Sequence, residues 1–178
     1  MLGRIFFACL LLLLGLCSPG SSLSCRWMDH KFRQYSENSL VLIDMMASHY
    51  TGQHEVASPH HLYSQASKLS PADKVAFAAQ VLKEVCELLE EEDGSSSWEE
   101  STVEHFLNVI IRQGEELSAC IGGHKKTNRK LHMYFKRLPR TVFVQMGRSA
   151  EAWELIRREI KSHLMEMDML VASLLTAN

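Results

Sequence analysis

Histidines are the residues of this sequence that first invite a metal-binding interpretation. Four of the nine fall within residues 49–69, and they are His49, His54, His60 and His61. Their spacing matches no zinc-ligand pattern, and no cluster of cysteines or carboxylates accompanies them. The sequence therefore predicts neither a metal site nor a cofactor.

Catalytic signatures are absent from the sequence as well. It holds no G-x-S-x-G, no H-E-x-x-H, no Walker sequence and no glycine-rich nucleotide motif. His105 follows Glu104 but has no nucleophile partner. His163 falls near an apolar helical stripe, which indicates a histidine at the edge of a core. We predict that the protein is not an enzyme.

The first 24 residues have the organisation of a secretory signal peptide. Arg4 supplies a positive charge, and the apolar run 5–16 is shorter than the about 20 residues of a membrane span. Ser22 and Ser24 are small residues at positions −3 and −1, so we predict cleavage after Ser24, with cleavage after Ser22 as the alternative. Residues 25–178 would then form one domain that is secreted, soluble and extracellular, without a transmembrane segment.

Removal of this leader leaves three cysteines in an oxidising compartment. Cys86 lies on the apolar stripe of a predicted helix, which indicates a buried free thiol. Cys25 and Cys120 both fall at predicted helix ends, where a bridge is geometrically easy. We predict a disulfide between Cys25 and Cys120.

Helical periodicity accounts for most of the domain. Apolar residues recur at spacings of three and four in five segments, at about 25–48, 70–93, 97–121, 126–146 and 150–175. Residues 49–69 form a long connection, and such a crossover is required in an up-up-down-down bundle. Pro139 interrupts the fourth helical pattern, where we expect a kink or a break.

The last of these segments, residues 150–175, has one apolar stripe and one polar strip. Three residues that open the stripe are predicted to be core: Trp153, Ile156 and Ile160. Three charged residues fall on the outward strip: Glu154, Arg158 and Lys161. Arg157 lies at the edge of the stripe. The alternative interpretation of the outward strip is an ordinary solvated helix face.

The same segment carries a family resemblance. The run Ala152-Trp153-Glu154, followed by Ile156-Arg157 and Glu159-Ile160, resembles the C-A-W-E-x-x-R-x-E-I signature that opens the last helix of type I interferons. Glu151 stands where that signature has cysteine, and the tail 168–173 resembles the teleost branch of the family. The resemblance implies an all-α helical cytokine bundle of five long helices with a long crossover. It supports the Cys25–Cys120 bridge and, without a cysteine at position 151, the two-cysteine group of fish interferons.

The resemblance also implies a function. The protein would be an antiviral cytokine that binds a heterodimer of two class II cytokine receptor chains and induces JAK–STAT signalling and interferon-stimulated genes. Arg157 matches the arginine of the family motif at the higher-affinity chain, and helix geometry adds Glu154, Arg158 and Lys161. We expect Arg157→Ala to weaken binding to that chain without lowering the melting temperature. The alternatives are another class II helical cytokine, of the interleukin-10 type, and a lipid-binding or membrane-active helical protein.

A basic stretch predicts the second receptor face. No acidic residue occurs between Glu116 and Glu151, and four cations there are assigned to this face: Lys126, Arg129, Lys130 and Arg137. The second receptor chain would touch the helices at 70–93, 97–121 and 126–146. A basic amphipathic helix could also bind heparan sulfate or acidic lipid, or be an ordinary solvated face. The slightly acidic net charge of −2 argues against a general nucleic-acid binder.

Overall fold

The structure is a computed structural model that describes residues 25–47, 58–91, 98–122 and 126–176. These residues form α2 (Arg26–His30), α3 (Phe32–Met45), α4 (His60–Ala66), α5 (Pro71–Glu91), α6 (Glu100–Cys120), α7 (Arg129–Met146) and α8 (Ala150–Leu175). The predicted all-α fold is confirmed, and α8 has the bounds that its sequence pattern predicts. None of the helices in the described part combines the length and hydrophobicity that a membrane crossing requires.

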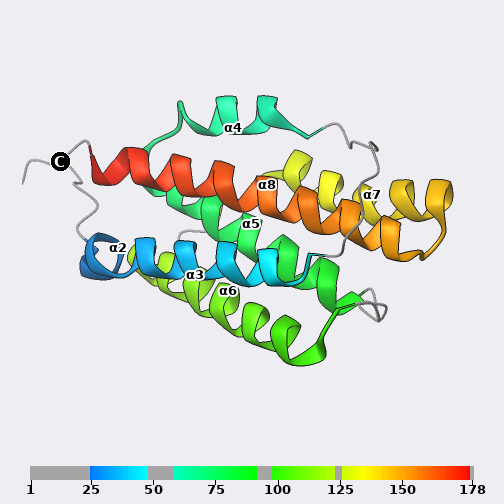
Figure 1. The fold of residues 1–178 in the computed structure, drawn as a ribbon. Helices are drawn as coiled ribbons and strands as arrows, with labels where there is room; N and C mark the ends of the chain where they lie inside the picture. The colour runs from blue at the N-terminus through cyan, green and yellow to red at the C-terminus, as the bar shows by residue number, and fades with distance from the viewer. Residues whose placement is uncertain (1–24, 48–57, 92–97, 123–125, 177–178) are drawn as a thin grey trace, which may run out of the picture.

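Four long helices, α3, α5, α6 and α8, form the central bundle. α3 and α5 run in one direction, and α6 and α8 run in the opposite direction (Figure 1). α3 and α5 each pack against both α6 and α8, while α7 packs on α5 and α8. These directions confirm the up-up-down-down topology. Because α3 and α5 are parallel, the chain between them must return along the length of the bundle, which requires a long connection. α4 lies along α8 within that connection (Figure 1).

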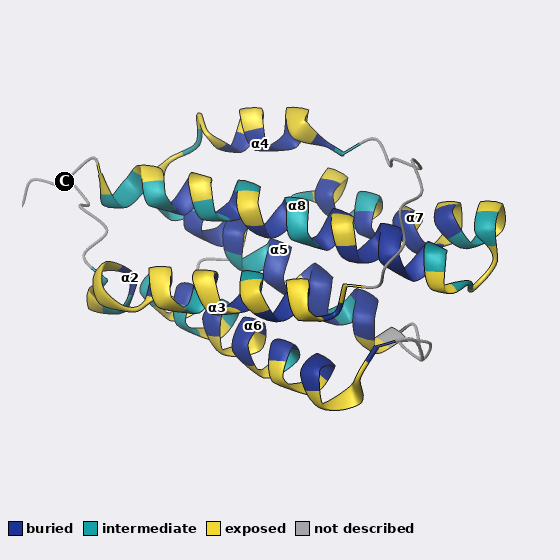
Figure 2. Cartoon of the chain, in the orientation of Figure 1, coloured by how far each residue is buried: buried dark blue, intermediate teal, exposed yellow. Residues whose placement is uncertain are grey.

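The core is built from the inward sides of these helices, where buried residues face one another (Figure 2). Trp153, Ile156 and Ile160 are 1%, 0% and 0% exposed, which confirms all three as core residues. The Trp153 ring lies 5.4 Å from that of Trp98 and 5.1 Å from that of Phe143, measured between ring centroids. α8 therefore contributes its largest side chain to the contact between α7 and the residues just before α6.

Two predicted elements differ in the structure. The first helix is not continuous, because Lys31 separates α2 from α3 with a φ of −120°. The break lies where Cys25 is tied to another helix and Trp27 packs against Tyr35 at 5.4 Å. The connection 49–69 is not loop throughout, because residues 60–66 form α4. A short helix can form there because its apolar side packs on α8.

Pro139 neither breaks nor ends its helix. α7 continues from Arg129 to Met146 with the proline inside it. Proline removes one backbone donor and normally kinks a helix, but Pro139 is itself buried between Leu138 and Val142 on the packed side of α7. Tertiary packing therefore outweighs the local preference for a break.

Candidate functional site

The outward side of α8 lies beside α3 and carries the first candidate surface. Lys161 Nζ lies 2.7 Å from both carboxylate oxygens of Asp44 on α3. Ser36 Oγ donates to Asp168 Oδ1 at 2.6 Å further along the same seam. These contacts hold the two helices antiparallel and leave Arg158 exposed beside Lys161, which is half-buried. Periodicity had not predicted a role for Asp44.

Large apolar side chains are exposed around this seam. Val41 and Met45 on α3 are 57% and 65% exposed, and Met165 on α8 is 49% exposed. Single exposed apolar residues are common, but a group of them on neighbouring helices marks an interaction surface. We call this surface the α3–α8 face and define it as Val41, Asp44, Met45, Arg158, Lys161 and Met165.

Glu154 and Arg157 lie beneath that face rather than on it. They are 4% and 6% exposed, so the predicted outward position of Glu154 is wrong. Arg157 donates from Nε and Nη2 to the two carboxylate oxygens of Glu154 at 2.8 and 2.7 Å. Its Nη1 donates to the carbonyl of Ile43 at 3.0 Å. The hydrogen bonds that Arg157 donates to Glu154 raise the pKa of Arg157, so the guanidinium stays charged.

The Arg157–Ile43 hydrogen bond completes the end of a helix. Ile43 is among the last four residues of α3, whose carbonyls have no donor within the helix. A cation at a helix C-terminus also interacts favourably with the helix dipole. Arg157 therefore fixes the end of α3 against α8, which positions Asp44 and Met45 on the α3–α8 face.

A cluster of polar side chains in the interior joins α4, α7 and α8. The Tyr63 hydroxyl lies 2.6 Å from Nδ1 of His163, which is 0% exposed and therefore lies inside the core rather than at its predicted edge. Tyr134 donates a hydrogen bond to Oε1 of Glu159. The Nε2 of His163 lies 3.4 Å from the same oxygen, a distance that suits an ion pair but without hydrogen-bond geometry.

Burial and hydrogen bonding determine which side chains of this cluster are ionised. Burial raises the pKa of Tyr63 and that of Tyr134 well above the usual range, so both phenols stay protonated. Burial also acts to raise the pKa of Glu159, but His163 and Tyr134 outweigh it and lower the pKa. Glu159 is therefore an ionised carboxylate inside the fold.

The histidines of the crossover do not gather into one site among the described residues. His60 Nδ1 lies 2.9 Å from Glu166 Oε1 on α8, and His61 is exposed. His49 and His54 lie outside the described residues. The His60–Glu166 contact adds to the Tyr63–His163 hydrogen bond in holding α4 on α8.

The basic residues of the predicted second face are all exposed. Lys126 pairs with Asp73 at 3.2 Å, and Arg129, Lys130 and Arg137 extend along α7. Asn128 positions this helix. Its side chain accepts from the backbone N–H groups of the first turn, and its own backbone N–H donates to Gln80 of α5 at 2.7 Å.

A groove of about 910 Å³ runs between α5 and α6 beside the start of α7. Its lining is mainly apolar and includes Ile110, Ile111 and Ile121, with Lys126 and His132 among its polar residues. The groove lies on the three helices to which the second receptor chain was assigned. It gives that surface a concave shape, which helical periodicity could not indicate.

The predicted disulfide is confirmed. Cys25 and Cys120 are bonded, with their Cα atoms 5.4 Å apart, and the bridge ties the start of α2 to the end of α6. The bridge closes a loop of 95 residues, which contributes about 5 kcal/mol in the chain-entropy model. Cys86 is a buried free thiol as predicted, and burial with nearby Glu90 and Glu87 raises its pKa to about 12. Cys86 is therefore uncharged and unreactive at neutral pH.

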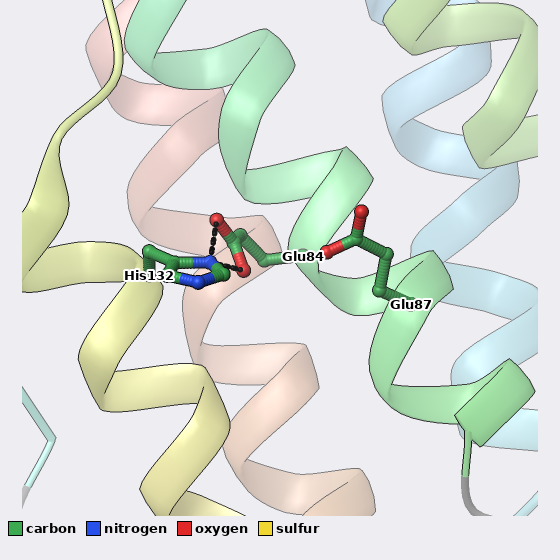
Figure 3. Close-up of side chains that lie close together, drawn as sticks. All are labelled: Glu84, Glu87 and His132. Atoms are coloured by element: carbon green, nitrogen blue, oxygen red, sulfur yellow. Dashed lines mark hydrogen bonds and ion pairs between the residues drawn. The ribbon is translucent and has the colours of Figure 1, made fainter.

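One cluster of titratable residues was not foreseen from the sequence. Glu84 and Glu87 on α5 face His132 on α7, and Glu84 lies between the other two (Figure 3). The Nδ1 of His132 lies 3.1 and 3.0 Å from the two oxygens of Glu84. Residues 84 and 132 are far apart in the chain, so no local spacing could indicate the cluster.

Comparisons with known proteins agree with this geometry. A family model for the interferon alpha/beta domain matches residues 28–174. Interferon a3 of Oncorhynchus mykiss is 36% identical over 151 residues, covering 84% of this chain and 86% of that protein. Interferon alpha-4 of Homo sapiens is 24% identical over 145 residues, covering 72% of this chain and 75% of that protein.

A solved structure is similar over nearly its whole length. Zebrafish interferon 1 superposes with a TM-score of 0.72 at 30% identity, covering 84% of this chain and 99% of that chain. The helices described above thus adopt the interferon fold. The chain belongs to the interferon alpha/beta family, whose members are non-enzymatic cytokines.

Proposed function

We propose that this interferon is a secreted antiviral cytokine that binds two class II cytokine receptor chains and so induces JAK–STAT signalling and interferon-stimulated genes. The observation that carries the proposal is the α3–α8 face, an exposed group of apolar and charged side chains on two neighbouring helices. The similarity to trout and zebrafish interferons and the Cys25–Cys120 bridge favour the two-cysteine group of fish interferons.

The higher-affinity receptor chain would bind the α3–α8 face. Met45, Val41 and Met165 offer apolar area, and Arg158 and Lys161 offer charge at its edge. Apolar anchors carry most interface energy when they become fully desolvated, whereas rim charges act mainly on association rate. Glu154 and Arg157 would contribute indirectly, by holding the end of α3.

The second receptor chain would bind α5, α6 and α7. The groove accepts apolar side chains of a partner, and the exposed cations at positions 126, 129, 130 and 137 attract an acidic surface. The two faces share no helix, so one molecule could hold both chains at once.

Binding of variants to each isolated receptor chain tests this proposal. Changing Met45, Val41 and Arg158 to alanine should weaken binding to one chain at least tenfold and leave the other unchanged. Changing Arg129, Lys130 and Arg137 to alanine should do the reverse, mainly through a slower association rate at low salt. Arg33→Ala is the matched control, since Arg33 is an exposed cation on α3 that pairs locally with Glu37.

A reporter driven by an interferon-stimulated promoter completes the test. Either triple variant should fall at least tenfold in potency while keeping the wild-type melting temperature. If both variants bind both receptor chains like the wild type, or both lose the same chain, the two-face assignment is wrong.

Heparan sulfate is a second candidate partner for the basic face. Its support is the run of exposed cations on α7, within a stretch of sequence that carries no acid between residues 116 and 151. Wild-type protein should then elute from immobilised heparin at higher salt than the Arg129, Lys130 and Arg137 triple variant, because each lost cation removes a sulfate contact. Equal elution would exclude this partner.

A further inference from the structure

Three side chains that suit a transition metal meet between α5 and α7. One potential ligand atom from each of Glu84, Glu87 and His132 lies within 4.8 Å of the others. Glu84 is only 4% exposed, and the ring of His132 presents Nδ1 to its carboxylate (Figure 3). A buried carboxylate and an imidazole nitrogen from different helices are thus already aligned on a common point.

We propose that Glu84, Glu87 and His132 form a Zn²⁺-binding site. One imidazole nitrogen with two carboxylates suits Zn²⁺, whereas Ca²⁺ and Mg²⁺ prefer oxygen ligands alone. Bonds of about 2.0–2.2 Å in a tetrahedron hold ligand atoms roughly 3.3 Å apart. The Nδ1 of His132 and an oxygen of Glu84 are 3.0 Å apart in a hydrogen bond that a bound ion would replace, and the carboxylate would shift outward to make room for the ion.

The surroundings leave room for the remaining ligands. Glu87 is half-buried one turn from Glu84 and pairs with Lys83 at 2.9 Å. That pair is exposed enough to contribute little to stability, so its carboxylate can turn to the metal at low cost. A hollow of about 100 Å³ opens beside Glu84 and Glu87 and can hold a water molecule as the fourth ligand.

Neighbouring groups adjust the strength of the site. Gln80 Nε2 donates to Glu84 Oε1 at 3.0 Å and orients that carboxylate, as supporting residues of metal sites do. Lys136 and Arg140 line the same hollow and oppose a cation. A site of three protein ligands with these cations nearby binds Zn²⁺ more weakly than a closed four-ligand structural site.

A bound ion would connect α5 to α7 at a position that the disulfide does not reach. Glu84 and His132 also line the groove between α5 and α6. Zn²⁺ would therefore stabilise the native state by mass action and fix one wall of that groove. This inference does not depend on the proposed receptor binding, because its readouts are metal binding and melting temperature.

The test uses the protein purified from culture medium without an affinity tag, in a Cys86→Ser background that removes the buried thiol. Thermal melts are recorded with EDTA, Mg²⁺ or Zn²⁺, and isothermal titration gives the stoichiometry. Zn²⁺ should raise the melting temperature and bind at one ion per chain, whereas Mg²⁺ should leave the melting temperature at its EDTA value.

Three variants separate this site from other histidines. His132→Gln and Glu87→Gln should each weaken Zn²⁺ binding at least tenfold. Glu87→Gln changes a half-buried side chain and keeps the test valid if His132→Gln fails to fold. His105→Gln, an exposed histidine on α6, should bind like the parent. No Zn²⁺-induced shift in the melting temperature of the parent protein would overturn the proposal, and so would a shift in His132→Gln and Glu87→Gln as large as that of the parent.

Discussion

At the scale of single residues, Arg157 shows how one side chain serves two helices. It neutralises a buried glutamate on its own helix and supplies a donor to the C-terminal end of α3. Its sequence position at the edge of the apolar stripe was compatible with either an exposed or a buried guanidinium. Only the position of α3, which the pattern of α8 cannot specify, decides between them.

Arg157→Ala should therefore destabilise the protein, in contrast to the expectation from the sequence. The change leaves Glu154 charged and buried and the Ile43 carbonyl without its donor, so the free energy of unfolding should fall by about 3 kcal/mol. Arg158→Ala is the control and should change it by no more than about 1 kcal/mol. Urea unfolding of both variants measures the difference, and equal midpoints would contradict the structural role.

At the scale of elements, sequence patterns predicted long helices better than short ones. The 26 residues of α8 have a continuous apolar stripe, and Ser149 precedes them as the N-cap. Gly147, with a φ of +64°, ends the helix before it. The bounds of α8 could therefore be predicted from the sequence. α4 has only 7 residues and too few turns for a periodic signal. The formation of α4 depends on contacts with α8, about 100 residues later in the chain. A local sequence pattern cannot predict such contacts.

α4 should detach from α8 before the rest of the bundle unfolds when its central hydrogen bond is removed. Tyr63→Phe deletes the hydroxyl that contacts Nδ1 of buried His163, at a cost of about 1–3 kcal/mol. Hydrogen exchange should then quicken in residues 60–66 more than in α6. Ser64→Ala, an exposed change in the same helix, should leave exchange unaltered. Uniform acceleration across all helices would show that α4 does not move as a separate unit.

At the scale of the whole molecule, stability should depend on pH through the ionised Glu159. Its pKa is lowered in the folded state, so its contribution is complete above about pH 4.3, the ordinary glutamate value, and is lost as the pH falls through the folded value. Urea unfolding from pH 3 to 7 should show wild type more stable than Glu159→Gln near neutrality. The two curves should converge in acid. A constant gap between them would mean that ionisation of Glu159 has no effect.

The whole fold also shows which features could be read from the sequence alone. The five long helices, the topology, the Cys25–Cys120 bridge and the core of α8 follow from periodicity, cysteine position and family resemblance. The α3–α8 face, the groove and the Glu84–His132 contact depend on how separate helices meet. Such arrangements arise from side-chain packing between distant segments, so a single sequence carries little direct sign of them.

The position of α8 has a consequence for synthesis of the protein in the cell. α3, α4, α5 and α7 all pack on this last helix, so each lacks part of its partner surface while the chain is still being translated. At about 5–20 residues per second, the 26 residues of α8 take seconds to be added after the helices that pack on them. The nascent chain therefore exposes the apolar sides of four helices until α8 has been synthesised, so the bundle cannot be completed progressively from the N-terminus.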